Sequence, residues 1–285
     1  IGSSLVGSEM CIRDRINMHS VASKKSKFFT HMGNREHFTH KLSWGNEFDD
    51  QTFSFDIAYE NNPYAISVNP SGTEPDPYRF RDINLNYSVD LSQSESIFVN
   101  SMNRNHDISL DAYNGDDLDY VGKWKMTNNQ FIYANNNTMV AVNQTSHDRT
   151  YTDGDLISSY ISDVDTLLVH TTLDNFTYGV ELENVSASFD INGDWGYNSY
   201  NTHESRQNRG AFFGYDDRNY TIGVRHDDLY SITTYRIGGQ IAGFRTSWAT
   251  GFKAPTLYEL FGKDTFGFNG NPNLAPERSE TVEIG

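Results

Sequence analysis

Carboxylates are the side chains of this sequence that come closest to a recognisable chemical site. Asp116, Asp117 and Asp119 form one cluster, and Asp216 and Asp217 form another. Oxygen ligands of this kind can bind Ca²⁺, but neither cluster has the spacing of an EF-hand loop. Polar turns have the same composition, and we regard solvated turns as the better interpretation. The two clusters are therefore weak calcium candidates.

The motifs of nucleophilic, zinc-dependent and nucleotide-dependent enzymes are missing from the sequence. It has no GxSxG, HExxH, P-loop or GxGxxG motif and no pair of cysteines. His37 and His40 lie at positions of opposite parity, so on a strand they face opposite sides and cannot hold one ion together. We therefore predict no catalytic residue, no enzyme activity and no cofactor.

Composition favours a β protein with one hydrated face. The chain has 285 residues, of which 14% are aromatic and only 36% are hydrophobic. A β-barrel with a wet interior needs an apolar residue only at every second position, whereas a soluble core needs longer apolar runs. No apolar run is long enough for a transmembrane helix. The net charge of −16 disfavours nucleic acid as a partner.

Alternating apolar and polar residues predict the strands that would position these groups. The clearest stretch is 53–60, where Phe, Phe, Ile and Tyr alternate with Ser, Asp, Ala and Glu, and 83–90 and 176–183 repeat the pattern. A helix would scatter these apolar side chains around its circumference. We count roughly eleven to thirteen strands in all, although the pattern leaves the register between 102 and 160 undefined.

Long polar connections alternate with short turns along the predicted strands. Residues 61–77 and 184–208 are predicted to be long loops, whereas 92–94 and 174–175 are short turns. Outer-membrane barrels combine long extracellular loops with short periplasmic turns in this way. A soluble sandwich of two stacked sheets shows the same residue alternation, so the alternation alone does not separate the two folds.

The two faces of these strands have different expected environments. The acidic positions of the polar face are expected to line a hydrated lumen; they are Asp56, Glu60, Glu181 and Glu183. Aromatic residues near predicted strand ends are expected at the membrane interface; they are Trp44, Tyr59, Tyr87 and Trp248.

The most informative stretch is 245–285, which is predicted to form a strand, a structured loop and another strand. Pro255 ends the first strand because it offers no N–H, and two further prolines frame a rigid turn. The notable positions are Gly251, Phe252, Lys253, Ala254, Pro255, Leu257, Tyr258, Leu260, Phe261, Gly270, Asn271, Pro272, Asn273, Leu274, Pro276 and Glu277. We favour a structural role for them, and substrate contact remains the alternative.

These motifs resemble the signature of the TonB-dependent receptors of the bacterial outer membrane, in particular the vitamin B12 and siderophore branch. The resemblance implies an antiparallel, up-and-down transmembrane β-barrel of about 22 strands, of which this chain would be a part without the plug. It also implies a receptor in the outer membrane of a Gram-negative bacterium, surrounded by lipid. Such a receptor imports a ferric siderophore, haem or cobalamin with energy from the TonB-ExbB-ExbD complex, which acts through the plug region.

Two other classes remain open at this stage. One is a passive porin or an adhesin-type barrel, and the other is a secreted, carbohydrate-active β protein, which would need a carboxylate pair across a cleft. Residues 1–15 resemble a translated adaptor sequence and are expected to contribute no structure. We therefore predict a single partial barrel domain over 16–285.

Overall fold

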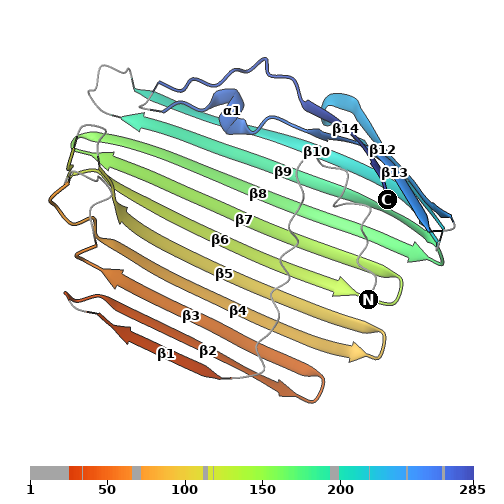
Figure 1. Cartoon of the computed structure of the whole chain (residues 1–285), viewed down its shortest axis with the longest axis horizontal. Coiled ribbons are helices and arrows are strands. Elements are labelled where there is room, and N and C mark those ends of the chain that lie inside the picture. Colours follow the sequence, from red (N-terminus) through yellow and green to blue (C-terminus); the bar gives the residue numbers. More distant parts are fainter. Residues whose placement is uncertain are drawn as a thin grey trace.

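One antiparallel sheet contains all fourteen strands of the described part of the chain, and each strand pairs with the next in sequence (Figure 1). The computed structural model describes residues 26–33, 35–65, 72–111, 115–117, 119–192, 199–217, 219–241, 243–264 and 267–285. The predicted adaptor segment 1–15 lies outside these residues. No second sheet stacks on the first within them, which confirms a single antiparallel wall and excludes the two-layered sandwich.

The strands grow longer toward the middle of the sheet. Their bounds are β1 Lys27–Met32, β2 Phe38–Phe48, β3 Gln51–Asn62, β4 Tyr78–Ser92, β5 Glu95–Ser109, β6 Val121–Ala134, β7 Thr138–Asp153, β8 Leu156–Leu173, β9 Phe176–Asn192, β10 Tyr200–Asp216, β11 Tyr220–Asp227, β12 Ile232–Ile241, β13 Phe244–Lys253 and β14 Glu277–Ile284. A 3-10 turn η1 covers Leu229–Ser231, and one short helix α1 covers Leu257–Phe261.

The structure has fourteen strands, more than the predicted eleven to thirteen, and it includes β1, for which no strand was predicted; other segments differ from the prediction in type or length. Residues 120–126 and 131–134, predicted as two short strands, belong to the single strand β6. Residues 184–208, predicted as a loop, belong mainly to β9 and β10. The connection before β14, predicted as a loop, also contains helix α1.

The two ends of the sheet differ in the length of their connections. At one end, which we call the short-turn end, the strands are joined by 49–50, 93–94, 135–137, 174–175 and 217–219. The opposite, long-loop end carries 63–77, 110–120 and 254–276. The predicted alternation of long and short connections therefore holds in part, since the long-loop end also carries the two-residue connection 154–155; the three long loops still give the sheet a direction.

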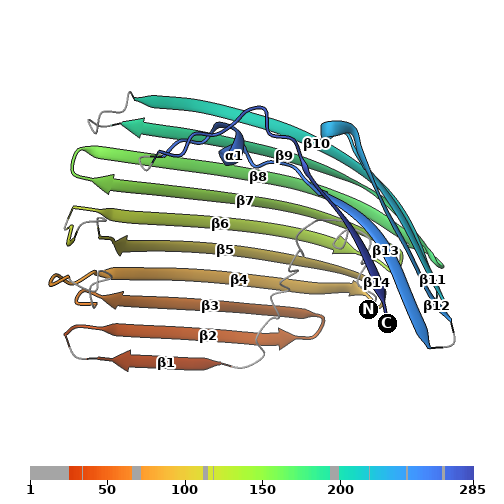
Figure 2. The same ribbon diagram turned by 45° about the horizontal axis from the view of Figure 1, so that its top comes forward.

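The two faces of the sheet follow from where α1 lies. Phe189 of β9 packs against Leu257 and Leu260 of α1, so the odd-numbered residues of β9 lie on the face that we call the α1 face. Beyond β10 the sheet curls, so that β12 to β14 turn toward this side (Figure 2). The opposite, outer face has no other element of the described chain against it.

Exposed apolar side chains form a band on the outer face toward the short-turn end. Val180 of β9 is 49% exposed and Ile237 of β12 is 53% exposed. A soluble protein rarely leaves a contiguous group of apolar side chains this exposed. Register links further members of this band, which include Val142, Tyr178, Leu182, Phe213 and Ile222. We call these residues the apolar band. Within the described residues no helix is long and apolar enough to cross a membrane.

Strand β9 shows why its second half was mistaken for a loop. From Phe176 to Leu182 the apolar residues lie on the outer face, but from Val185 to Ile191 they lie on the α1 face. The outer positions from Asn184 onward are polar. The strand therefore leaves the apolar band near residue 183 and gains a packing partner, α1, on its other face. This exchange of faces breaks the simple alternation.

Candidate functional site

One row of directly paired residues crosses the α1 face near the long-loop end. Each member is the register partner of the next, from β3 to β9: Glu60, Phe80, His106, Trp124, Arg149, Tyr160 and Phe189. Residues that face each other across antiparallel strands point to the same side of the sheet. Because Phe189 points toward α1, the whole row lies on the α1 face.

Ring contacts connect this row with its neighbours into an aromatic surface. The ring centroids of Phe80 and His106 are 4.5 Å apart, and those of Tyr160 and Phe189 are 5.1 Å apart. Tyr151, from the next row toward the long-loop end, lies 6.2 Å from Trp124. These distances suit stacked and edge-to-face pairs.

Helix α1 extends this surface from the opposite side. Tyr258 lies 5.6 Å from Tyr160 in an edge-on arrangement, and its other neighbour Phe268 is stacked on it at 4.8 Å. We define the aromatic wall as Phe80, His106, Trp124, Tyr151, Tyr160, Phe189 and Tyr258.

Polar groups lie among the rings of the wall. The Tyr78 hydroxyl donates to Glu60 Oε1 at 2.8 Å, and His106 Nε2 lies 2.9 Å from Asp82 Oδ1. Arg149 stands between Trp124 and Tyr160 in the row. An apolar surface with a few oriented polar groups is the usual character of a small-molecule site. The arrangement can therefore stack planar or apolar groups and fix their orientation.

The signature residues mainly build and hold α1. Thr256 caps the helix, since its hydroxyl accepts from the Glu259 N–H at 3.1 Å while the Glu259 carboxylate accepts from the Thr256 N–H at 2.7 Å. Leu257 and Leu260 are buried against β9. The Tyr200 hydroxyl of β10 donates to the Phe261 carbonyl at 2.7 Å. The sheet thus holds α1 through apolar packing and at least one hydrogen bond.

The return half of the signature is equally structural. Lys253 Nζ lies 3.2 Å from Glu259 and 3.5 Å from Glu277, so it connects the helix with the end of β13 and the start of β14. Gly270 runs so close to α1 that a Cβ there would lie 2.6 Å from the backbone of Leu260. Asn271 closes the following turn by accepting from the Asn273 N–H at 3.0 Å.

Of the predicted signature positions, Tyr258 is itself part of the aromatic wall, and Leu257 and Leu260 pack against the wall at Phe189. Gly251, Phe252 and Lys253 end β13, Glu277 begins β14, and 271–275 is an exposed turn. Contact of these residues with a substrate stays a prediction.

Farther toward the short-turn end, the α1 face carries a buried charge cluster. Arg225 Nη2 and Nε donate to Asp227 at 2.7 and 2.9 Å, and its Nη1 donates to Glu181 at 3.1 Å. Arg225 crosses Gly210, where a Cβ would lie 2.5 Å from Nη2. Glu181 was expected to be solvated by lumen water, but it is 5% exposed and paired. Such a cluster connects β9 with β11, and removing one member would leave a buried charge unpaired.

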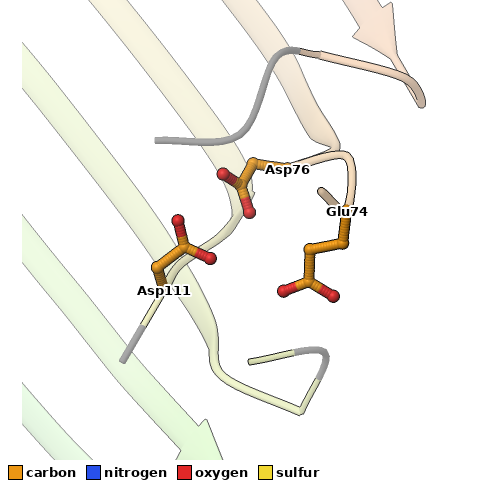
Figure 3. Close-up of side chains that lie close together, drawn as sticks. All are labelled: Glu74, Asp76 and Asp111. Atoms are coloured by element: carbon orange, nitrogen blue, oxygen red, sulfur yellow. The ribbon is translucent and has the colours of Figure 1, made fainter. Parts of the chain in front are cut away.

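A second group of carboxylates lies at the long-loop end (Figure 3). Glu74 and Asp76 come from the connection before β4, and Asp111 follows β5; their carboxylate oxygens lie within 4.8 Å of one another. Three carboxylates could supply part of the oxygen shell that Ca²⁺ takes. None of the predicted calcium candidates belongs to this trio of described residues.

The predicted calcium candidates have roles in turns. Asp116 accepts from the Thr73 N–H at 2.7 Å and from the Glu74 N–H at 3.2 Å, and so joins two long loops. This hydrogen bonding, led by the Thr73 N–H, lowers the pKa of Asp116. Asp217 accepts from the Tyr220 N–H at 2.7 Å in the β10–β11 turn. Calcium binding by these residues, or by Asp117, Asp119 and Asp216, stays a prediction.

Sequence reasoning missed the aromatic wall. Trp124 and Tyr160 fall in the stretch whose register was undefined, and Phe189 falls in the supposed loop. A signal was present at Trp124 and Phe189, because each is flanked by polar residues as in the clear strands, whereas Tyr160 is followed by Ile161. Only the register between strands shows that the rings meet.

Comparisons with solved structures identify the fold. The siderophore receptor PiuA from Acinetobacter baumannii superposes with a TM-score of 0.62 at 12% identity, covering 93% of this chain and 55% of that chain. The siderophore receptor PirA from Pseudomonas aeruginosa gives 0.55 at 12% identity, covering 87% and 49%. The copper transporter OprC gives 0.56 at 11% identity, covering 88% and 49%.

At these identities the likeness shows the fold alone, and the chain spans about half the length of these structures. No curated protein sequence matches. A family model described as TonB dependent receptor-like, beta-barrel, matches residues 29–285. The chain therefore belongs to the family of TonB-dependent receptor β-barrels, which are transport receptors and not enzymes.

Proposed function

We propose that the chain forms part of the wall of an outer-membrane receptor in a Gram-negative bacterium. The apolar band would contact lipid, and the α1 face would line the lumen. Both assignments are supported by exposed residues such as Val180 and Ile237 on one face and by charged and amide side chains on the other. In such barrels long loops are extracellular, so the aromatic wall would lie at the outer mouth.

We further propose that the receptor takes up a scarce nutrient of the ferric siderophore, haem or cobalamin class. The single observation that carries this proposal is the aromatic wall on the lumen side of the mouth. Rings such as Trp124 and Tyr160 offer large contact area at low entropic cost to a bulky, partly planar ligand. The names of PiuA and PirA as siderophore receptors support this class.

Import would draw energy from the TonB-ExbB-ExbD complex through a plug region outside this chain. A passive porin is the competing function, and the two differ in saturation and energy dependence. Cells that produce the complete receptor should accumulate labelled ligand with saturation, and accumulation should stop when the proton gradient is collapsed. Unsaturable uptake that survives the collapse would support the porin instead.

Ligand binding can be tested on the wall itself. Trp124→Ala should weaken binding of ferric siderophores, haem or cobalamin to outer-membrane vesicles about fivefold, since stacking on one aromatic residue contributes about 1 kcal/mol. Trp44→Ala is the matched control, because Trp44 lies on the outer face beside Phe55. Equal binding by both variants and the unchanged chain would contradict this placement of the site.

A further inference from the structure

Two long loops and one tight turn beside the aromatic wall carry charge of one sign. The segments 63–77, 110–120 and 153–155 contain no Lys or Arg. Their acidic residues in the described chain are Glu74 and Asp76 in the first, Asp111, Asp116, Asp117 and Asp119 in the second, and Asp153 and Asp155 in the third. We call these carboxylates the acidic rim.

Tyr120 connects the rim with the wall. Burial raises the pKa of Tyr120, and the charges of Asp153, Asp117 and Asp264 raise it further. The ring of Tyr120 lies 6.3 Å from that of Tyr151, a member of the wall. Carboxylates from two of the rim loops and from the α1 loop therefore act on the same tyrosine beside the wall.

Crowding within the rim appears at Glu74 as well. Burial raises the pKa of Glu74, and the nearby carboxylates of Asp116, Asp111 and Asp76 add to this, against a backbone hydrogen bond at Asp117 that lowers it. Like charges held this close create a negative field that water and salt reduce without removing. A concave surface of one sign concentrates ligands of the opposite sign.

The face of an aromatic ring also favours positive charge. A ring attracts a cation through its quadrupole within about 6 Å of the centroid. The structure already contains one such pair beside the wall, with Lys263 Nζ 4.2 Å from the centroid of Tyr200. Basic groups on the α1 face near the wall include Arg149, Lys263 and Arg104, and the rim carboxylates outnumber these three. The rings and the rim therefore both favour a positively charged ligand.

We propose that the aromatic wall takes a positively charged ligand, such as a metal chelate with a free ammonium group, in preference to a neutral or polyanionic chelate. This inference rests on the proposed receptor function and narrows its substrate class. The ammonium group would lie against the rings, and the acidic rim would speed its capture.

A matched pair of probes tests the charge preference. The first is a linear ferric trihydroxamate with a free ammonium group, and the second is the same chelate N-acetylated and so uncharged. In vesicles containing the chain, the ammonium form should bind about fivefold or more tightly at low salt, and the ratio should shrink at high salt. A ferric tricatecholate, which is polyanionic, should bind most weakly of the three.

Two variants with equal charge change localise the effect. Asp117→Asn, Asp119→Asn and Asp153→Asn combined should abolish the preference for the ammonium form. The control combines Asp49→Asn, Asp50→Asn and Asp90→Asn near the short-turn end and should keep the preference. Equal affinity for the two hydroxamates, or a preference that survives the rim variant, would overturn the charge inference and leave the receptor function standing.

A second measurement does not depend on any chelate binding. Ser158 is the register partner of Tyr151, a member of the wall. A thiol placed there by Ser158→Cys, in a Cys11→Ser background, therefore reports the local electrostatic potential. Its rate of modification by a cationic methanethiosulfonate is divided by its rate with an anionic one. This ratio should be at least fivefold higher than the same ratio for a free thiol. The rim variant should lower this ratio to that of the free thiol. A ratio equal to that of the free thiol overturns the inference, whereas failure of every chelate to bind counts against the proposed function.

Discussion

Removing the ring of Phe189 should release α1 from the sheet. Phe189 is 2% exposed and lies beneath Leu257, Leu260 and Tyr258. Replacing a buried Phe by Ala costs about 3–5 kcal/mol, because transfer energy is lost and a cavity remains. Helix α1 has only five residues, so it cannot persist without its packing partner. The Phe189→Ala substitution should therefore undock α1 while the strand pairing around it survives.

Hydrogen exchange at the α1 amides is the direct assay. The Leu260 N–H donates to Thr256 at 3.1 Å and the Gly262 N–H donates to Tyr258 at 2.8 Å, so both amides are protected only while the helix is intact. Their exchange should accelerate at least tenfold in Phe189→Ala, since each 1.4 kcal/mol corresponds to about a factor of ten.

The matched control is Phe213→Ala on the neighbouring strand β10. Phe213 is 43% exposed on the outer face and pairs with Tyr178, away from α1. This variant loses the same ring and should leave the α1 amides as protected as before. Equal protection of α1 in Phe189→Ala and the unchanged chain would refute the reasoning that the apolar end of β9 holds the helix.

Three further outcomes are expected. Ile57→Arg places a charge on the outer face, where Ile57 is 41% exposed, and should lower the free energy of unfolding by about 2–4 kcal/mol if the residue lies at the membrane midplane. Denaturant unfolding in lipid measures this cost, and Asp56→Arg on the α1 face should cost less. Equal costs would contradict the assignment of the two faces. Gly270→Ala should accelerate α1 exchange, because its Cβ would meet helix backbone at 2.6 Å; unchanged exchange would contradict this contact. The lowered pKa of Asp116 means that its ionised form stabilises the loop contact, fully so above the unfolded pKa of about 3.9. Proteolysis of this loop should therefore increase as the pH falls through the pKa of Asp116 in the folded protein. Asp116→Ala should remove that pH dependence.

Strong local patterns made part of this fold predictable. The alternation at 53–60 and 176–182 predicted strands with one apolar face, and those positions form β3 and β9. The motifs at 251–277 predicted the family and a strand, loop and strand. Thr256 with Glu259 is a capping-box pattern that could also have revealed α1.

The aromatic wall required information that the pattern of a single strand does not contain. Trp124, Tyr160 and Phe189 lie in one row only because the four strands β6 to β9 pair in one register, and a shift by one residue would move each ring to the other face. Strand β9 added a second difficulty, because its apolar residues change faces where the outer surface becomes polar. A search for apolar residues at every second position assumes that they stay on one face, so it does not detect the second half of such a strand.

The central claim is that alternate residues of the same strand face lipid on one side and a hydrated lumen on the other. Nitroxide labels placed singly along 176–190 of β9, in a Cys11→Ser background and in lipid vesicles, measure this directly through collisions with oxygen and with a water-soluble nickel chelate. Oxygen collisions should peak at positions 178, 180 and 182 and nickel collisions at 177 and 183, and the outer positions beyond 184 should become accessible to nickel. Oxygen and nickel accessibility that do not alternate along 176–183 would contradict the account.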